Sequence, residues 1–224
     1  GQCFKLLGVT FDLKLHMDLA CYEIAAEAGW RVRAILRCRP FYDCVSLLAL
    51  YKAQVLSYIE FRTAAIYHAP DFFLHAVDKV QDNFLNEIGL TPETALLQYN
   101  LSPLRTRRDI AMLGLIFRAA RGLAPLQFEH FFKRASPGDF QRGWAYSVDK
   151  HSFQLKDPIQ ASSSRAMKRS ALCLVHVWNM LPRHVVEHKK VSSFQRCLQD
   201  GVKQAARLKL PEWNRILKSG IFSL

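Results

Sequence analysis

Apolar and polar residues alternate at the start of the chain, and the pattern then changes to a helical period. Residues 4–11, FKLLGVTF, alternate in the way that predicts a β-strand. Over residues 15–37 apolar side chains recur at roughly helical spacing, with acidic residues early and arginine late, which predicts one long helix. Pro40 ends this helix, because its ring does not fit a helix interior.

The next two segments are also helical in pattern. Residues 41–69 are apolar on nearly all sides, which predicts a helix that is buried on most of its surface. Residues 71–88 repeat apolar positions at three-four spacing, which is typical of an amphipathic helix, and Gly89 ends it. Thr91 and Pro92 then suit the N-cap and first position of a further helix.

The second half of the chain continues the helical pattern around one irregular segment. Helices are predicted over 104–121 and, more briefly, over 125–134. Residues 135–160 gather Gly, Pro, Ser and Asp, which indicates a loop with two short strands at most. Two more helices are predicted over 162–181 and 191–210, so we expect a mainly α fold with one short N-terminal strand.

Charge divides the chain more sharply than the helical pattern does. Residues 1–100 hold 9 Lys+Arg against 11 Asp+Glu, a net charge of −2, whereas residues 101–224 hold 22 against 8, a net charge of +14. We therefore distinguish a helical region over 1–100 from a basic helical region over 101–224. Such an excess is typical of a protein that binds a phosphate backbone, and a basic solubilising surface is the alternative.

The candidate contacts with nucleic acid lie at helix ends and along one helix of the basic region. They are Arg105, Arg107, Arg108, Arg118, Arg121, Lys168, Arg169, Lys189 and Lys190. A simpler interpretation is that these groups only solvate the ends of their helices.

The sequence gives little support for a disulfide scaffold, a zinc site or a membrane span. The six cysteines include no C-x-x-C pair, so neither a disulfide scaffold nor a zinc site is indicated, and we expect a nuclear or cytoplasmic protein with reduced thiols. The longest apolar runs are broken by Arg, Gln or His and fall short of the roughly 20 residues that cross a bilayer. We therefore expect a soluble chain without a membrane partner.

One motif resembles a metal site but has the wrong surroundings. HVVEH at 184–188 matches the H-x-x-E-H order of inverted zinc proteases, yet Pro182 precedes it and two lysines follow. Polymerase chemistry needs converging carboxylates, and the sequence has no Asp-Asp pair. Asp12 and Asp18 are explained by the beginning of a helix. We expect no catalytic residue, metal ligand or cofactor in this chain.

Four stretches, taken in order, carry a family resemblance. They are FKLLGVTFDLKLHMDLACYEIAAEAGWRVRAILR at 4–37, VLSYIEFRTAAIYHA with LHAVDKVQDNFLNEIGL within 55–90, LSPLRTRRDIAMLGLIFRAARGLAP at 101–125, and VHVWNMLPRHVVEHKKVSSFQRCLQ at 175–199. Their order and spacing resemble the later blocks of non-LTR (LINE-type) retrotransposon reverse transcriptases, including a terminal W-N-x-L-P signature. The chain departs from that pattern at Asn86, Glu87, Phe117 and Gln195.

The resemblance implies a division of labour within a larger polymerase. Residues 1–100 would be the end of the palm and a thumb-like helical region, and 101–224 a basic C-terminal region. The catalytic palm, with the aspartates that bind Mg²⁺, would lie upstream of Gly1, so we expect no primer extension by this chain alone. The implied partners are a template-primer duplex of RNA and/or DNA and the remainder of the polymerase. The alternative is a stand-alone helical module that binds nucleic acid or protein.

Overall fold

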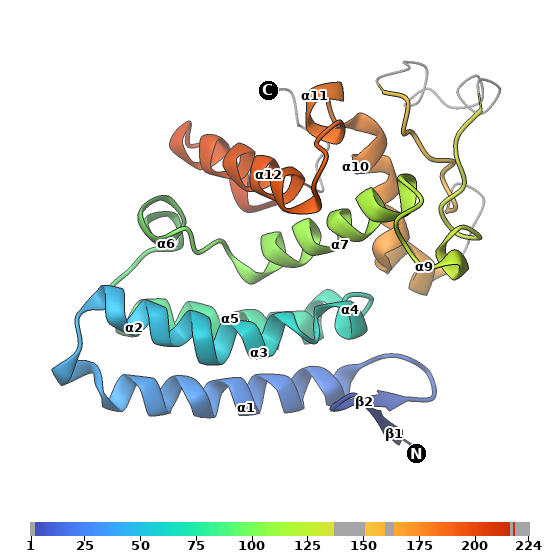
Figure 1. The fold of residues 1–224 in the computed structure, drawn as a ribbon. Coiled ribbons are helices and arrows are strands. Elements are labelled where there is room, and N and C mark those ends of the chain that lie inside the picture. The colour runs from blue at the N-terminus through green and yellow to red at the C-terminus, as the bar shows by residue number, and fades with distance from the viewer. Residues whose placement is uncertain (1–2, 137–150, 160–163, 216, 218–224) are drawn as a thin grey trace. The chain divides into compact units, whose positions relative to one another are not determined.

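A computed structural model of the chain describes residues 3–136, 151–159, 164–215 and 217 (Figure 1). The chain divides into two compact units, Gly1–Arg108 and Asp109–Leu224, which we call the N-terminal and the C-terminal unit. The expected mainly α fold is confirmed. The division falls after Arg108 instead of after residue 100, so three of the candidate arginines belong to the N-terminal unit.

The N-terminal extended segment is a β-hairpin. Strands β1 (Cys3–Leu6) and β2 (Val9–Asp12) pair antiparallel, so the single strand expected over 4–11 is two short ones. Leu7 and Gly8 form the turn with φ of 49° and 76°, the positive values that a tight hairpin turn requires. The Phe4 side chain is 53% exposed, as expected for a sheet without further strands among the described residues.

Helices build the rest of the N-terminal unit. They are α1 (Asp18–Arg37), α2 (Cys44–Tyr51), α3 (Ser57–Glu60), α4 (Thr63–Ile66), α5 (Asp71–Glu87) and α6 (Pro92–Tyr99), with a 3-10 turn η1 (Arg39–Phe41) and a π turn η2 (Lys52–Leu56). Helix α1 packs along α5 and along α2 and η2 (Figure 1). The Thr91 hydroxyl accepts from the Thr94 N–H at 3.1 Å, so the expected cap of α6 is confirmed.

The segment 41–69 differs most from its prediction. It is interrupted at η2 and again before α4, and Val45 and Phe61 are exposed, so it is not one helix buried on most sides. Side chains along one stripe of this segment, such as Leu47 and Tyr51, are buried in the core. Apolar residues outside this stripe, such as Val45 and Ala49, raise the hydropathy without being buried. For this reason Cys44–Phe61 has the length and apolar composition of a membrane span, although its stripe lies in the core of a unit.

A buried polar chain ties this stripe to the rest of the N-terminal unit. The Tyr51 ring stacks on Phe84 with the centroids 4.4 Å apart. The Tyr51 hydroxyl donates to Gln81 Oε1 at 3.2 Å, and Gln81 Nε2 donates to the Ser102 carbonyl at 2.9 Å. Burial raises the pKa of the Tyr51 phenol, so it stays a neutral donor.

The C-terminal unit consists of shorter pieces than the sequence predicts. Its helices are the later part of α7 (Leu104–Ala120), α9 (Arg165–Arg169), α10 (Leu174–Met180), α11 (Arg183–Val186) and α12 (Val191–Arg207), with 3-10 turns η3 (Leu126–Phe128), η5 (Ala171–Cys173) and η6 (Trp213–Arg215). The helix expected over 125–134 is only the turn η3. The helix expected over 162–181 breaks at Ser170, whose hydroxyl accepts from the Leu172 N–H at 3.2 Å and so competes with the helix.

The expected loop over 135–160 is only partly described. Its described end forms an isolated antiparallel bridge between Arg134 and Leu155. The middle of this prediction, 137–150, lies outside the described residues.

Candidate nucleic-acid interface

The arginines that open α7 face carboxylates of the N-terminal unit. Arg105 Nη2 lies 3.4 Å from Asp71, and Arg107 Nε lies 2.5 Å from Glu60. Arg108 makes a two-pronged pair with Asp78, at 2.6 and 2.9 Å, and its side chain is 5% exposed. Each pair therefore joins α7 to another helix of the same unit.

This geometry changes the interpretation of the three arginines. The Arg108 guanidinium is buried and donates to both carboxylate oxygens of Asp78, so a phosphate cannot reach it. Arg108 is therefore corrected from a candidate contact to a structural residue. Arg105 and Arg107 are partly exposed and can reach solvent, but their charge is already balanced by Asp71 and Glu60. The sequence could not show this, because the carboxylates lie 30 to 47 residues upstream.

The two arginines at the end of α7 differ from each other. Arg118 is exposed. The guanidinium of Arg121 lies 4.6 Å from the ring centroid of Phe117 and 4.7 Å from that of Phe153. It also donates to the Val186 carbonyl at 2.8 Å. Arg121 therefore holds the C-terminal unit together, and Arg118 remains available for an external contact.

The W-N-x-L-P signature also has a structural role here. Trp178 Nε1 donates to the Phe153 carbonyl at 2.8 Å. The Asn179 amide bonds both backbone groups of Leu155, accepting from its N–H at 2.8 Å and donating to its carbonyl at 2.7 Å. The pair clamps the segment 151–155 onto α10. Because buried backbone groups need partners, this clamp lets an irregular segment enter the core.

Two further helices of this unit approach each other at a glycine. A Cβ placed on Gly114 would lie 2.5 Å from Gln195 Nε2, so a larger residue there would displace the Gln195 amide. Gln195 Nε2 donates to the Ile110 carbonyl at 3.4 Å. Phe117 stacks on Phe194 with the centroids 4.8 Å apart. Phe117 and Gln195, where the sequence departs from the family pattern, therefore serve packing within the unit.

The remaining candidates lie in the C-terminal unit outside its core. Lys168, in the last turn of α9, is exposed, and Arg169 beside it is half-buried. Lys189 and Lys190 are exposed, and Lys190 is the N-cap residue of α12. Among the residues that the structure describes, Lys168, Lys189 and Lys190 make no ion pair. Together with Arg118, these three lysines are the candidates that, among the described residues, keep both exposure and an unbalanced charge.

Counting charge by unit strengthens the contrast between them. Residues 1–108 hold 12 Lys+Arg and 11 Asp+Glu, a net charge of +1, and residues 109–224 hold 19 and 8, a net charge of +11. The ion pairs of α11, α12 and η6 join residues only three or four positions apart. The C-terminal unit therefore carries a large positive field.

The candidate metal motif has no metal-site geometry. The carboxylate of Glu187 accepts from Arg183 Nε at 2.6 Å, and Val185 and Val186 point into the core from a four-residue helix. Over residues 3–136, 151–159, 164–215 and 217, no three His, Cys, Asp or Glu side chains gather as ligands.

The chain has no match among protein-family models, curated proteins or solved structures.

Proposed function

We propose that the chain is a nucleic-acid-binding fragment, comprising the thumb and C-terminal region of a retrotransposon RNA-directed DNA polymerase, and that it is not catalytic by itself. The observation that carries the proposal is the net charge of +11 on the C-terminal unit, with exposed lysines that make no ion pair within the described part of the chain. The family part of the proposal rests on the four sequence stretches and their order.

The binding mode follows from the kind of groups available. Lysine is a compact point charge that contacts phosphates without selecting a base, so recognition is of backbone and duplex shape. Binding releases counterions from the nucleic acid and therefore weakens as salt is raised. A template-primer duplex of RNA and/or DNA is the proposed ligand. Mg²⁺ and the chemistry of polymerisation belong to the remainder of the proposed polymerase.

The first test removes two exposed charges from the C-terminal unit. Replacing Lys189 and Lys190 together with Ala should weaken binding to a short RNA–DNA duplex. It should also lower the slope of log affinity against log salt by about 2 units, given roughly 0.9 for each phosphate contact on B-form DNA. Fluorescence anisotropy at several salt concentrations measures both quantities in the full chain.

A matched control separates local contacts from total charge. Lys5 and Lys14 are exposed lysines of the N-terminal unit, and replacing both with Ala removes the same charge. We expect this variant to keep the wild-type slope. Equal affinity and slope for the two double variants would overturn the proposal that the C-terminal unit holds the duplex.

A further inference from the structure

The connection between α1 and α2 exposes aromatic rings that the core does not use. Every residue of the segment 37–43 is exposed. Phe41 is 82% exposed and Tyr42 is 51% exposed, although both rings are large enough to contribute to a core. Two neighbouring exposed aromatic residues form an apolar patch of the kind that marks an interaction site.

Hydrogen bonds and a proline hold the backbone of this turn in place. The Phe41 N–H donates to the Cys38 carbonyl at 3.0 Å, and the ring of Pro40 fixes its own φ. Directly afterwards, the Asp43 carboxylate accepts from the Ser46 N–H at 2.8 Å and begins α2. A ligand that stacks on this turn would therefore lose little affinity to ordering of the backbone.

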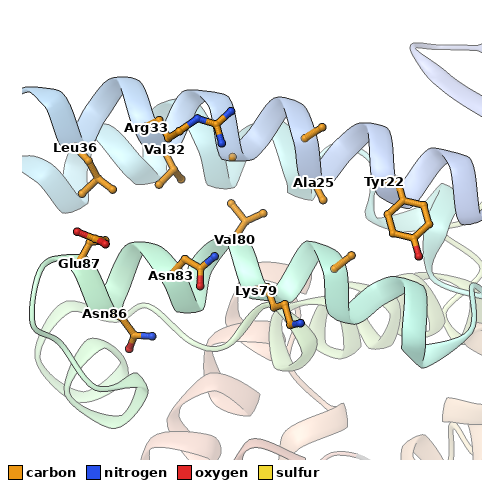
Figure 2. A pocket seen from close by; sticks show the side chains of 13 residues that line it. Tyr22, Ala25, Val32, Arg33, Leu36, Lys79, Val80, Asn83, Asn86 and Glu87 are labelled. Atoms are coloured by element: carbon orange, nitrogen blue, oxygen red, sulfur yellow. The ribbon is translucent and has the colours of Figure 1, made fainter.

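Cationic residues flank the two aromatic residues in the sequence and line the groove between α1 and α5. Arg37 is exposed, and Arg39 pairs with Glu87 at 3.1 Å while 56% of its side chain stays exposed. Glu87 also lines a groove of about 700 Å³ between α1 and α5 (Figure 2), so Arg39 of the turn contacts a residue of this groove. Arg33 on α1 and Lys79 on α5 line the same groove. Neither makes an ion pair among the described residues.

The floor of the groove is formed by small side chains. Ala25, Ala26, Gly29 and Ala76 leave space between the two helices. A Cβ on Gly29 would lie 3.9 Å from Arg33 Nη1, so the Arg33 side chain reaches the part of the groove beside Gly29. Asn83 lines the groove too and adds an uncharged polar group.

We propose that the turn 37–43 and this groove bind unpaired nucleotides of single-stranded RNA or DNA. Bases stack on Phe41 and Tyr42, and phosphates lie against Arg33 and Lys79. Every base can stack on an aromatic ring, so we expect this site to bind without sequence preference. Arg33 and Lys79 line a groove between two helices, one cation on each helix, and a groove suits a narrow strand better than the level surface of a bilayer. This site lies on the N-terminal unit and goes beyond the duplex contact proposed for the C-terminal unit.

The test replaces Phe41 and Tyr42 together with Ala in the full chain and measures binding of oligothymidylate and of a blunt duplex. Stacking of about 1 to 3 kcal/mol per base predicts a loss of at least about 5-fold for the single strand, with duplex affinity unchanged. Phe72→Ala is the matched control, because Phe72 is 75% exposed and follows an acidic residue, Asp71. Phe41→Leu keeps an apolar side chain and should also lose affinity.

A second variant tests the groove. Arg33→Ala with Lys79→Ala should lower the salt slope for the single strand by about 1.4 units, at roughly 0.7 for each contact. Failure of the wild-type chain to bind the single strand, or equal loss in the Phe72→Ala control, would overturn the proposal. The proposal would also be overturned if replacing Phe41 and Tyr42 weakened binding to vesicles of anionic phospholipid and left binding to the single strand unchanged. The Lys189 and Lys190 variant tests the duplex site separately.

Discussion

The two units use positive charge in opposite ways. In the N-terminal unit four arginines each pair with a carboxylate that lies outside their own helix or turn, namely Arg39, Arg105, Arg107 and Arg108. The net charge of this unit is +1. In the C-terminal unit Arg121 and Arg134 donate to carbonyl groups and lie against the ring of Phe153. Carbonyls and rings hold an arginine without cancelling its charge. The net charge of +11 on the C-terminal unit follows from its 19 Lys+Arg against 8 Asp+Glu.

This difference shows what a count of basic residues leaves out. The first turn of α7 belongs to the basic region by sequence, but its arginines are neutralised by acids of the N-terminal unit. A cation in such a pair contributes to folding, whereas an unpaired lysine contributes to the external field. Substitutions at Arg108, Asn179 and Asp12 measure how much stability comes from an ion pair, an uncharged clamp and a carboxylate bound to backbone.

The largest effect is expected at the buried pair of the N-terminal unit. Arg108→Ala leaves Asp78 without its two-pronged partner, and removing one member of a buried pair costs about 3 to 5 kcal/mol of unfolding free energy. Urea unfolding, monitored by hydrogen exchange of the backbone amides of α5, measures the loss of unfolding free energy. Arg105→Ala removes a longer, more exposed pair and should cost about 1 kcal/mol or less. Equal losses would show that burial does not distinguish the two pairs.

The next effect tests the uncharged clamp of the C-terminal unit. Asn179→Ala leaves the buried N–H and carbonyl of Leu155 without their partner, which should cost about 1 to 3 kcal/mol. Unfolding monitored by the fluorescence of buried Trp178 reports the change. Gln204→Ala, at an exposed position on α12, should change stability by less than about 0.5 kcal/mol. A stable Asn179→Ala variant would mean that the segment 151–155 does not depend on the clamp.

Local signals predict α1, α5, α7 and α12 better than the interrupted segments 41–69, 125–134 and 162–181, and they do not predict the contacts. The cap at Thr91 and the three-four spacing of α5 lie within a few neighbouring residues, so the sequence contains them. The hairpin turn was missed because Leu7, a residue that rarely adopts positive φ, occupies it. The Asn179–Leu155 clamp joins residues 24 positions apart, and no local pattern encodes such a distance. The basic region was visible in the sequence, but which of its cations are neutralised was not.

The smallest effect concerns an acid of the N-terminal unit that binds backbone instead of arginine. The Asp12 carboxylate accepts from the N–H groups of Lys14, His16 and Met17 at 2.9, 3.1 and 2.7 Å, and so fixes the connection from the hairpin to α1. Slight burial acts to raise the pKa of Asp12, but these donors outweigh it and hold the pKa below the ordinary value of 3.8.

A lowered folded-state pKa means that ionised Asp12 stabilises the fold above pH 3.8 and that this contribution is lost as the pH falls below it. Asp12→Ala should cost about 1 kcal/mol at neutral pH, the usual cost of losing a capping side chain. The difference from the wild type should shrink in acid, because protonated Asp12 is a weaker acceptor. Urea unfolding at neutral pH and near pH 3 measures both values. A difference that is constant or grows in acid would show that the carboxylate charge does not hold this connection.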